Sequence, residues 1–84
     1  MHYDRQVKIP LDFNGYHIAN YYIDFVAYRT DGVTEYIEAK GMPSEVWRLK
    51  WKLFEALYGD LPDVELYVIW QKSGYKVNKL KKIN

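Results

Sequence analysis

Hydrophobic and polar residues alternate over residues 5–11, with an apolar side chain at every second position. The apolar residues are Val7, Ile9 and Leu11. This two-residue period predicts a half-buried strand, and Pro10, which has no backbone N–H to donate, places that strand at a sheet edge. Asn14-Gly15 then predicts a hairpin turn, because this pair tolerates positive φ.

A second hairpin is predicted around Asp31-Gly32, another dipeptide typical of short hairpin loops. Residues 21–29 are rich in Tyr, Ile, Phe and Val, the residue types favoured in strands, and Thr34–Lys40 continues this composition. We therefore expect the first part of the chain to form a meander of three strands.

Residues 44–58 are predicted to form the main helix. Ser44 is a good N-cap, Glu45 favours the positive end of the helix dipole, and Gly59 ends the helix. An apolar stripe at helical spacing is expected to face the core. Its members are Val46, Leu49, Leu53, Phe54 and Leu57.

Val64–Trp70 is an almost continuous apolar run, which is typical of a strand in the interior of a sheet. With the preceding strand and helix it forms a β-α-β unit, expected to be right-handed. The predicted fold class is α/β, a small mixed sheet of element order β-β-β-α-β with one main helix. Residues 72–84 are a basic tail with five lysines and no acidic residue, expected to be a short helix or a frayed end.

Composition limits the classes of protein to which the chain can belong. Its 84 residues make one small domain, residues 1–84, that is only marginally stable alone. The absence of cysteine excludes disulfides and thiolate–zinc sites and is compatible with a reducing cytoplasm, where we expect the protein. The first residues lack the apolar core of a secretory signal, and no apolar run approaches the length of a membrane span.

The charges are divided unevenly although the net charge is only +1. Residues 1–42 carry six acidic and four basic side chains, whereas residues 43–84 carry five acidic and eight basic ones. A metal pocket followed by a phosphate-facing surface gives such a division. An ordinary solvated surface gives it equally well.

Candidate chemistry lies on the two strands of the second hairpin. Glu38 and Lys40 point to one face of their strand, and Ile37 and Ala39 are expected to pack underneath. Closure around Asp31-Gly32 brings Asp24 alongside, so that two carboxylates and an ammonium converge. Two hard oxygen donors suit Mg²⁺, and a lysine beside the metal stabilises developing negative charge. The alternative is a set of solvated residues on the wet face of a sheet.

The predicted helix interleaves basic and aromatic residues, a combination that binds nucleic acids through phosphate contacts and base stacking. The basic residues are Arg48, Lys50 and Lys52, and the aromatic ones are Trp47 and Trp51. The alternative is an amphipathic helix with aromatic residues at the core margin and snorkelling lysines. His2 and His17 lack any recognisable metal-ligand spacing, and we interpret both as surface residues.

The order of these motifs resembles the PD-(D/E)xK nuclease superfamily, and within it the small phage-type endonucleases and Holliday-junction-resolving enzymes. In those proteins a Y-x-x-DF strand leads through a short loop to a V-E-x-KG strand. The matching residues here are Tyr21, Asp24, Phe25, Ile37, Glu38, Lys40 and Gly41. The similarity runs from about residue 7 to residue 70, most of the chain.

The resemblance implies a restriction-endonuclease-like core that hydrolyses DNA phosphodiesters with Mg²⁺ or Mn²⁺. Asp24 and Glu38 are then metal ligands, joined by the backbone carbonyl of Ala39, and Lys40 is the catalytic lysine that orients the attacking water. Arg48, Lys50 and Lys52 are then contacts to the DNA backbone.

Two positions depart from the superfamily pattern. Ile23 stands where the motif name has Pro, and the first predicted strand begins by about residue 6, without the usual opening helix that carries a further Glu. Two other functions therefore stay open beside the nuclease. One is a non-catalytic nucleic-acid-binding module, and the other is an incomplete nuclease-fold protein that needs a partner or a homodimer mate.

Overall fold

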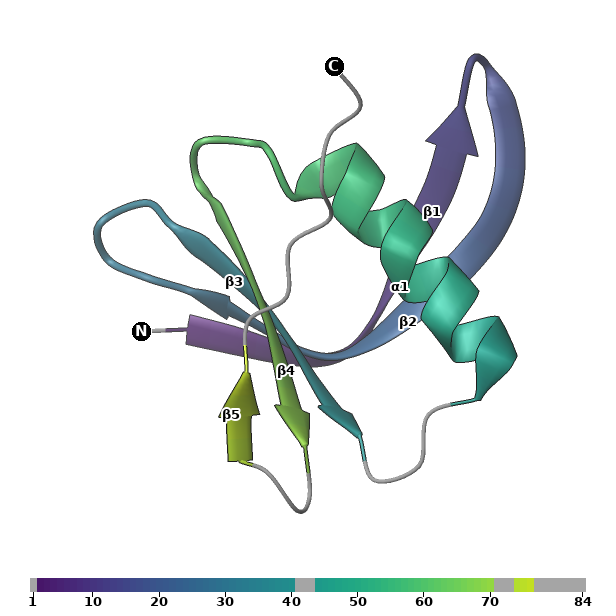
Figure 1. Ribbon diagram of the computed structural model, residues 1–84. Coiled ribbons are helices and arrows are strands. Elements are labelled where there is room, and N and C mark those ends of the chain that lie inside the picture. The colour runs from purple at the N-terminus through teal and green to yellow at the C-terminus, as the bar shows by residue number, and fades with distance from the viewer. Residues whose placement is uncertain (1, 41–43, 71–73, 77–84) are drawn as a thin grey trace.

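The computed structural model describes residues 2–40, 44–70 and 74–76 of the chain. Five strands form one mixed sheet in the order β1-β2-β3-β4-β5, and one helix packs on it (Figure 1). The elements are β1 (His2–Phe13), β2 (Tyr16–Tyr28), β3 (Thr34–Lys40), α1 (Glu45–Tyr58), β4 (Val64–Trp70) and β5 (Gly74–Lys76). The predicted α/β class and the order β-β-β-α-β are confirmed.

Both predicted hairpins form. Asn14 and Gly15 adopt φ values of 54° and 81° between β1 and β2, and Gly32 adopts 91° between β2 and β3. In the second turn the Asp31 carboxylate accepts a hydrogen bond from the Val33 amide (3.2 Å). β1 and β2 are longer than predicted because they stay paired up to the turn, where Phe13 lies opposite Tyr16.

The β-α-β unit is also confirmed, because β3 and β4 pair in parallel, from Thr34 with Val64 to Lys40 with Trp70. The Ser44 hydroxyl accepts a hydrogen bond from the Trp47 amide (3.1 Å) at the beginning of α1. Gly59 ends the helix, and its amide donates to the Glu55 carbonyl (2.8 Å). β1 lies at the sheet edge that Pro10 predicts.

The buried side of α1 differs from the predicted stripe. Phe54 is buried and Leu53 and Leu57 pack against the core as predicted, but Val46 and Leu49 are 66% and 70% exposed. Trp47 and Trp51 are buried in their place, on the same side of the helix as Phe54. These aromatic residues follow the i, i+4, i+7 spacing of one helix face. These residues face the core because β2 and β3 present aromatic rings to them. Tyr21 lies 5.4 Å and Tyr36 lies 5.2 Å from Phe54, measured between ring centroids.

The sheet divides into two arms beyond the middle of β2. The β2–β3 register runs from Tyr28 opposite Thr34 to Phe25 opposite Ile37 and ends there. Beyond that point the β1–β2 hairpin curves around α1, while β3, β4 and β5 continue in another direction (Figure 1). We call this divergence the strand fork, defined by Asp24 on β2 and Glu38 on β3.

The sheet face opposite α1, here called the outer face, carries Phe25, Ile37, Tyr67 and Ile69, as their register and the inward position of Tyr36 indicate. The described residues form one helix, so no helix in this part of the chain covers the outer face. β5 falls within the predicted tail and is a strand, so a helix is wrong at residues 74–76. The rest of the tail lies outside the described residues.

Candidate active site

Asp24 and Glu38 lie together at the strand fork, each bonded to the backbone of the opposite strand. The Asp24 amide donates to Glu38 Oε2 (3.2 Å), and the Ala39 amide donates to Asp24 Oδ2 (2.9 Å). Side-chain oxygens thus take the place of backbone carbonyls where the ladder ends. The structure therefore brings the two predicted carboxylates together. The burial of the residues around Glu38, however, is the reverse of what was expected.

Glu38 is 2% exposed, whereas Ala39 is exposed. The expectation that Ile37 and Ala39 pack beneath a wet Glu38 face is therefore wrong. Tyr36, two residues before Glu38, packs on Phe54 of α1, so this side of β3 faces the helix. A buried charge is tolerated only where hydrogen-bond donors surround it, and Glu38 has them.

Two of the groups that donate to Glu38 come from β2. Beside the Asp24 amide, the Tyr21 hydroxyl forms a hydrogen bond with the Glu38 carboxylate, and Trp47 Nε1 of α1 donates to Tyr21 Oη (3.0 Å). Burial, and then the Glu38 charge, raise the pKa of Tyr21 well above its usual range. The phenol therefore stays protonated and keeps its hydrogen for the carboxylate.

Asp24 is half-buried and held at both oxygens. Gln6 Nε2 donates to Oδ1 (3.0 Å), while the Ala39 amide occupies Oδ2. Gln6 adopts a φ of 52°, an uncommon value for a residue with a side chain, directly opposite the fork on β1. The role of Gln6 could not be predicted from the sequence, because nothing in the local pattern signals this backbone conformation.

The other predicted ligand and the predicted lysine lie on β3. Within a strand the N–H and C=O of one residue point to the same side, so the Ala39 carbonyl faces the fork as its amide does. Lys40 is the last residue of β3, opposite Trp70. The side chain of Lys40 lies outside the described part of the structure, and its role stays a prediction.

The residues at the fork fit a hard divalent cation. Two carboxylates and one carbonyl supply oxygen donors, and a carboxylate oxygen has two lone pairs, so it can accept a hydrogen bond and still bind a cation. Mg²⁺ needs only one or two protein carboxylates and completes its shell with water or phosphate oxygens. Among the described residues no group of three or more His, Cys, Asp or Glu could hold a metal.

The basic residues of α1 divide into two groups. Arg48 and Lys52 are exposed and lie one turn apart on the same side of the helix. Lys50 is half-buried, and its Nζ donates to the Asn20 carbonyl of β2 (3.2 Å), which ties the helix to the sheet. Trp47 and Trp51 are in the core, so the amphipathic interpretation of the helix is correct and base stacking by these two residues is wrong.

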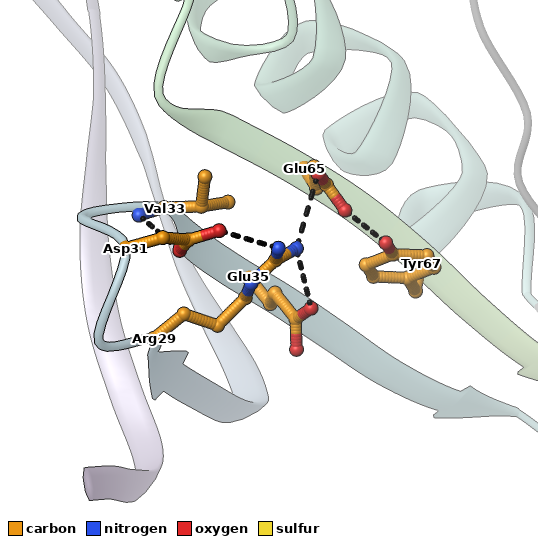
Figure 2. Close-up of polar contacts among 6 residues, drawn as sticks. All are labelled: Arg29, Asp31, Val33, Glu35, Glu65 and Tyr67. Atoms are coloured by element: carbon orange, nitrogen blue, oxygen red, sulfur yellow. Dashed lines mark hydrogen bonds and ion pairs between the residues drawn. The ribbon is translucent and has the colours of Figure 1, made fainter. Parts of the chain in front are cut away.

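A separate polar cluster lies at the turn end of β3 and β4 (Figure 2). Arg29 pairs with Asp31 (2.6 Å), Glu35 (3.4 Å) and Glu65 (3.3 Å), and Tyr67 donates to Glu65. The Val33 amide, and then Arg29, lower the pKa of Asp31. This Arg29 cluster joins the β2–β3 turn to β4, and we assign it a structural role.

The two histidines pair with nearby carboxylates at the surface, away from the fork. His2 lies 3.3 Å from Asp4, and His17 lies 2.6 Å from Asp12. Within the described ranges, the protein has no helix long and apolar enough to cross a membrane.

Comparison with known proteins gives a family and no described activity. No curated protein and no solved structure matches the chain significantly. One family model matches residues 3–77, which include the whole strand fork and α1. The chain therefore belongs to the family described as protein of unknown function, DUF1064.

Proposed function

We propose that this protein is a metal-dependent DNA endonuclease that hydrolyses phosphodiesters, with branched or phage DNA as candidate substrates. The observation that carries the proposal is the meeting of Asp24 and Glu38 at the strand fork of a β-α-β core. The order Asp, Glu-x-Lys, helix, strand, which resembles the PD-(D/E)xK nucleases, gives further support.

In this mechanism the residues at the fork would position the cation next to the substrate phosphate. Asp24, Glu38 and the Ala39 carbonyl would hold Mg²⁺ or Mn²⁺, and Lys40 would orient the attacking water and stabilise negative charge on the phosphate. When bound, the cation supplies Lewis-acid activation of water and of the phosphoryl oxygens. Arg48 and Lys52 contact DNA backbone phosphates from the exposed side of α1.

The test is cleavage of plasmid and branched DNA with Mg²⁺ or Mn²⁺, compared with the same reactions in EDTA. We expect nicking or linearisation only with metal. DNA binding that is independent of metal, without cleavage, contradicts the nuclease and favours the nucleic-acid-binding module. Neither cleavage nor binding favours the incomplete protein that needs a partner.

Arg48→Ala is expected to weaken DNA binding about equally for all sequences and to lower the slope of log affinity against log salt by about one. The reason is that a phosphate contact releases counterions without reading bases. Fluorescence anisotropy at several salt concentrations measures both quantities. Lys8→Ala is the matched control, because Lys8 is exposed on β1 away from α1, and it should leave the slope unchanged.

We also propose that the protein, with its cysteine-free composition suited to the cytoplasm, forms a homodimer through the outer face. Ile69 is 37% exposed on this face. Arg5 lies 5.5 Å from the centre of the Phe25 ring, and Phe25 pairs with Ile37, two residues along β3 from Glu35 of the acid-rich Arg29 cluster. In a two-fold interface each copy's Arg5 then faces the partner's surplus carboxylates, a self-complementary arrangement.

Sedimentation velocity at high protein concentration is expected to show a dimer, and Ile69→Lys is expected to shift it to monomer, since a lysine there adds an unpaired charge to the interface. Val46→Lys is the control, because Val46 is 66% exposed on α1 and lies on the other side of the sheet. A wild-type protein that stays strictly monomeric excludes this interface.

A further inference from the structure

Glu38 is buried, so its carboxylate needs hydrogen-bond donors, which neither carboxylate of the proposed metal site can supply. Glu38 is 2% exposed on the helix side of β3, and an ionised carboxylate at such a position needs donors at its oxygens. One donor is the Asp24 amide, at 3.2 Å from Oε2. A second donor is the hydroxyl of Tyr21, a residue that is 3% exposed.

Trp47 fixes the direction in which Tyr21 donates. An indole N–H can only donate, and Trp47 Nε1 lies 3.0 Å from Tyr21 Oη, so it fills an acceptor position of the hydroxyl. The single hydrogen of the hydroxyl is then left for the acceptor on its other side, which is Glu38. The result is a one-way series of donors from α1 through β2 to β3.

The rings of this series are immobilised by the core. The Tyr21 ring meets Trp51 edge-on at 6.1 Å and Phe54 at 5.4 Å, and Trp47 stacks on Trp51 at 5.9 Å, all between ring centroids. Rotation of Tyr21 or Trp47 therefore requires several buried aromatic residues to move together. A hydrogen bond from such a fixed hydroxyl fixes the plane of the carboxylate that accepts it.

We propose that Tyr21, supported by Trp47, is a positioning residue that orients the Glu38 carboxylate for its cation. This inference rests on the proposed function, because it assigns the second layer of that same site. Without the hydroxyl, Glu38 loses one donor while the Asp24 amide remains, and its carboxylate gains freedom to rotate. Partners of this kind in metal sites typically change metal affinity or activity by about 10- to 100-fold.

The test compares Tyr21→Phe with Tyr58→Phe. Each variant removes one hydroxyl from a ring packed on Phe54, but the Tyr58 hydroxyl donates to the Pro10 carbonyl (3.1 Å) rather than to the site. Mn²⁺ affinity, measured by electron paramagnetic resonance of free Mn²⁺, should fall about 10- to 100-fold in Tyr21→Phe. It should stay at the wild-type value in Tyr58→Phe, even though both variants lose thermal stability.

A second measurement on the metal-free protein separates this proposal from the proposed function. The ¹³C resonance of the Glu38 carboxyl group should move in Tyr21→Phe and in Trp47→Phe and stay in place in Tyr58→Phe. Wild-type protein that binds no Mn²⁺ overturns the metal site. An unmoved Glu38 resonance, or equal Mn²⁺ affinity in wild type and Tyr21→Phe, overturns the positioning role while the metal site stands.

Discussion

Asp24→Asn is expected to lower the rate of DNA cleavage by at least about a hundredfold, since a metal in a phosphoryl-transfer site stabilises charge by several kcal/mol. The substitution removes one negative charge and almost nothing else. An asparagine oxygen can accept from the Ala39 amide, and its amide group can donate to the Gln6 side chain once the Gln6 amide is reversed. The variant should therefore fold normally and lose its affinity for the cation.

The measurement is single-turnover cleavage across a range of Mg²⁺ and Mn²⁺ concentrations, with circular dichroism to verify folding. Raised Mn²⁺ is expected to restore part of the activity, because it compensates for weaker binding rather than for absent chemistry. Asp12→Asn is the matched control, since Asp12 is an exposed carboxylate near the β1–β2 turn. Equal cleavage by wild type and Asp24→Asn would exclude the strand fork as the active site.

Phe54→Ala is expected to lower the free energy of unfolding by about 3–5 kcal/mol. Phe54 is 0% exposed, and its ring lies within 5.5 Å of four other aromatic rings, measured between centroids. Those partners belong to α1, β2 and β3, so the cavity weakens the contact between the helix and the sheet. A domain of this size has a total of about 5–15 kcal/mol, and the variant will be partly unfolded at 37 °C.

Urea denaturation followed by tryptophan fluorescence gives this free energy. Leu49→Ala is the control on the same helix, because Leu49 is 70% exposed and an exposed substitution usually changes stability by less than about 0.5 kcal/mol. The comparison also tests which side of α1 is buried. A larger loss in Leu49→Ala than in Phe54→Ala would mean that the side of α1 with Val46 and Leu49, and not the side with Trp47 and Trp51, packs on the sheet.

Elements with strong local signals could be predicted almost to the residue. β3 and β4 have the expected bounds, and α1 is capped by the predicted Ser44 and Gly59, because caps and turn residues act over a few positions. The buried side of α1 could not be predicted in this way. Leucine and tryptophan positions compete at similar helical spacing, and the choice depends on the aromatic residues that β2 and β3 present.

The candidate site shows the same division. The turn at Asp31-Gly32 sets the register of β2 and β3, and this register makes Asp24 and Glu38 neighbours, so a local signal was sufficient. The burial of Glu38 and its hydrogen bond with Tyr21 depend on where the helix lies. Gln6 reaches Asp24 through an unusual backbone conformation. These features come from contacts between distant segments, which one sequence does not reveal.

The inward and outward sides of α1 should tolerate substitution differently during evolution. The helix reaches the fork through the inward-facing Trp47, whereas Val46, Arg48, Leu49 and Lys52 point outward and bear no part of the core. Mutations on the outward side can alter which molecules the protein recognises without disturbing the carboxylates. Relatives that act on different targets should therefore diverge on this side of the helix while they retain the aromatic side.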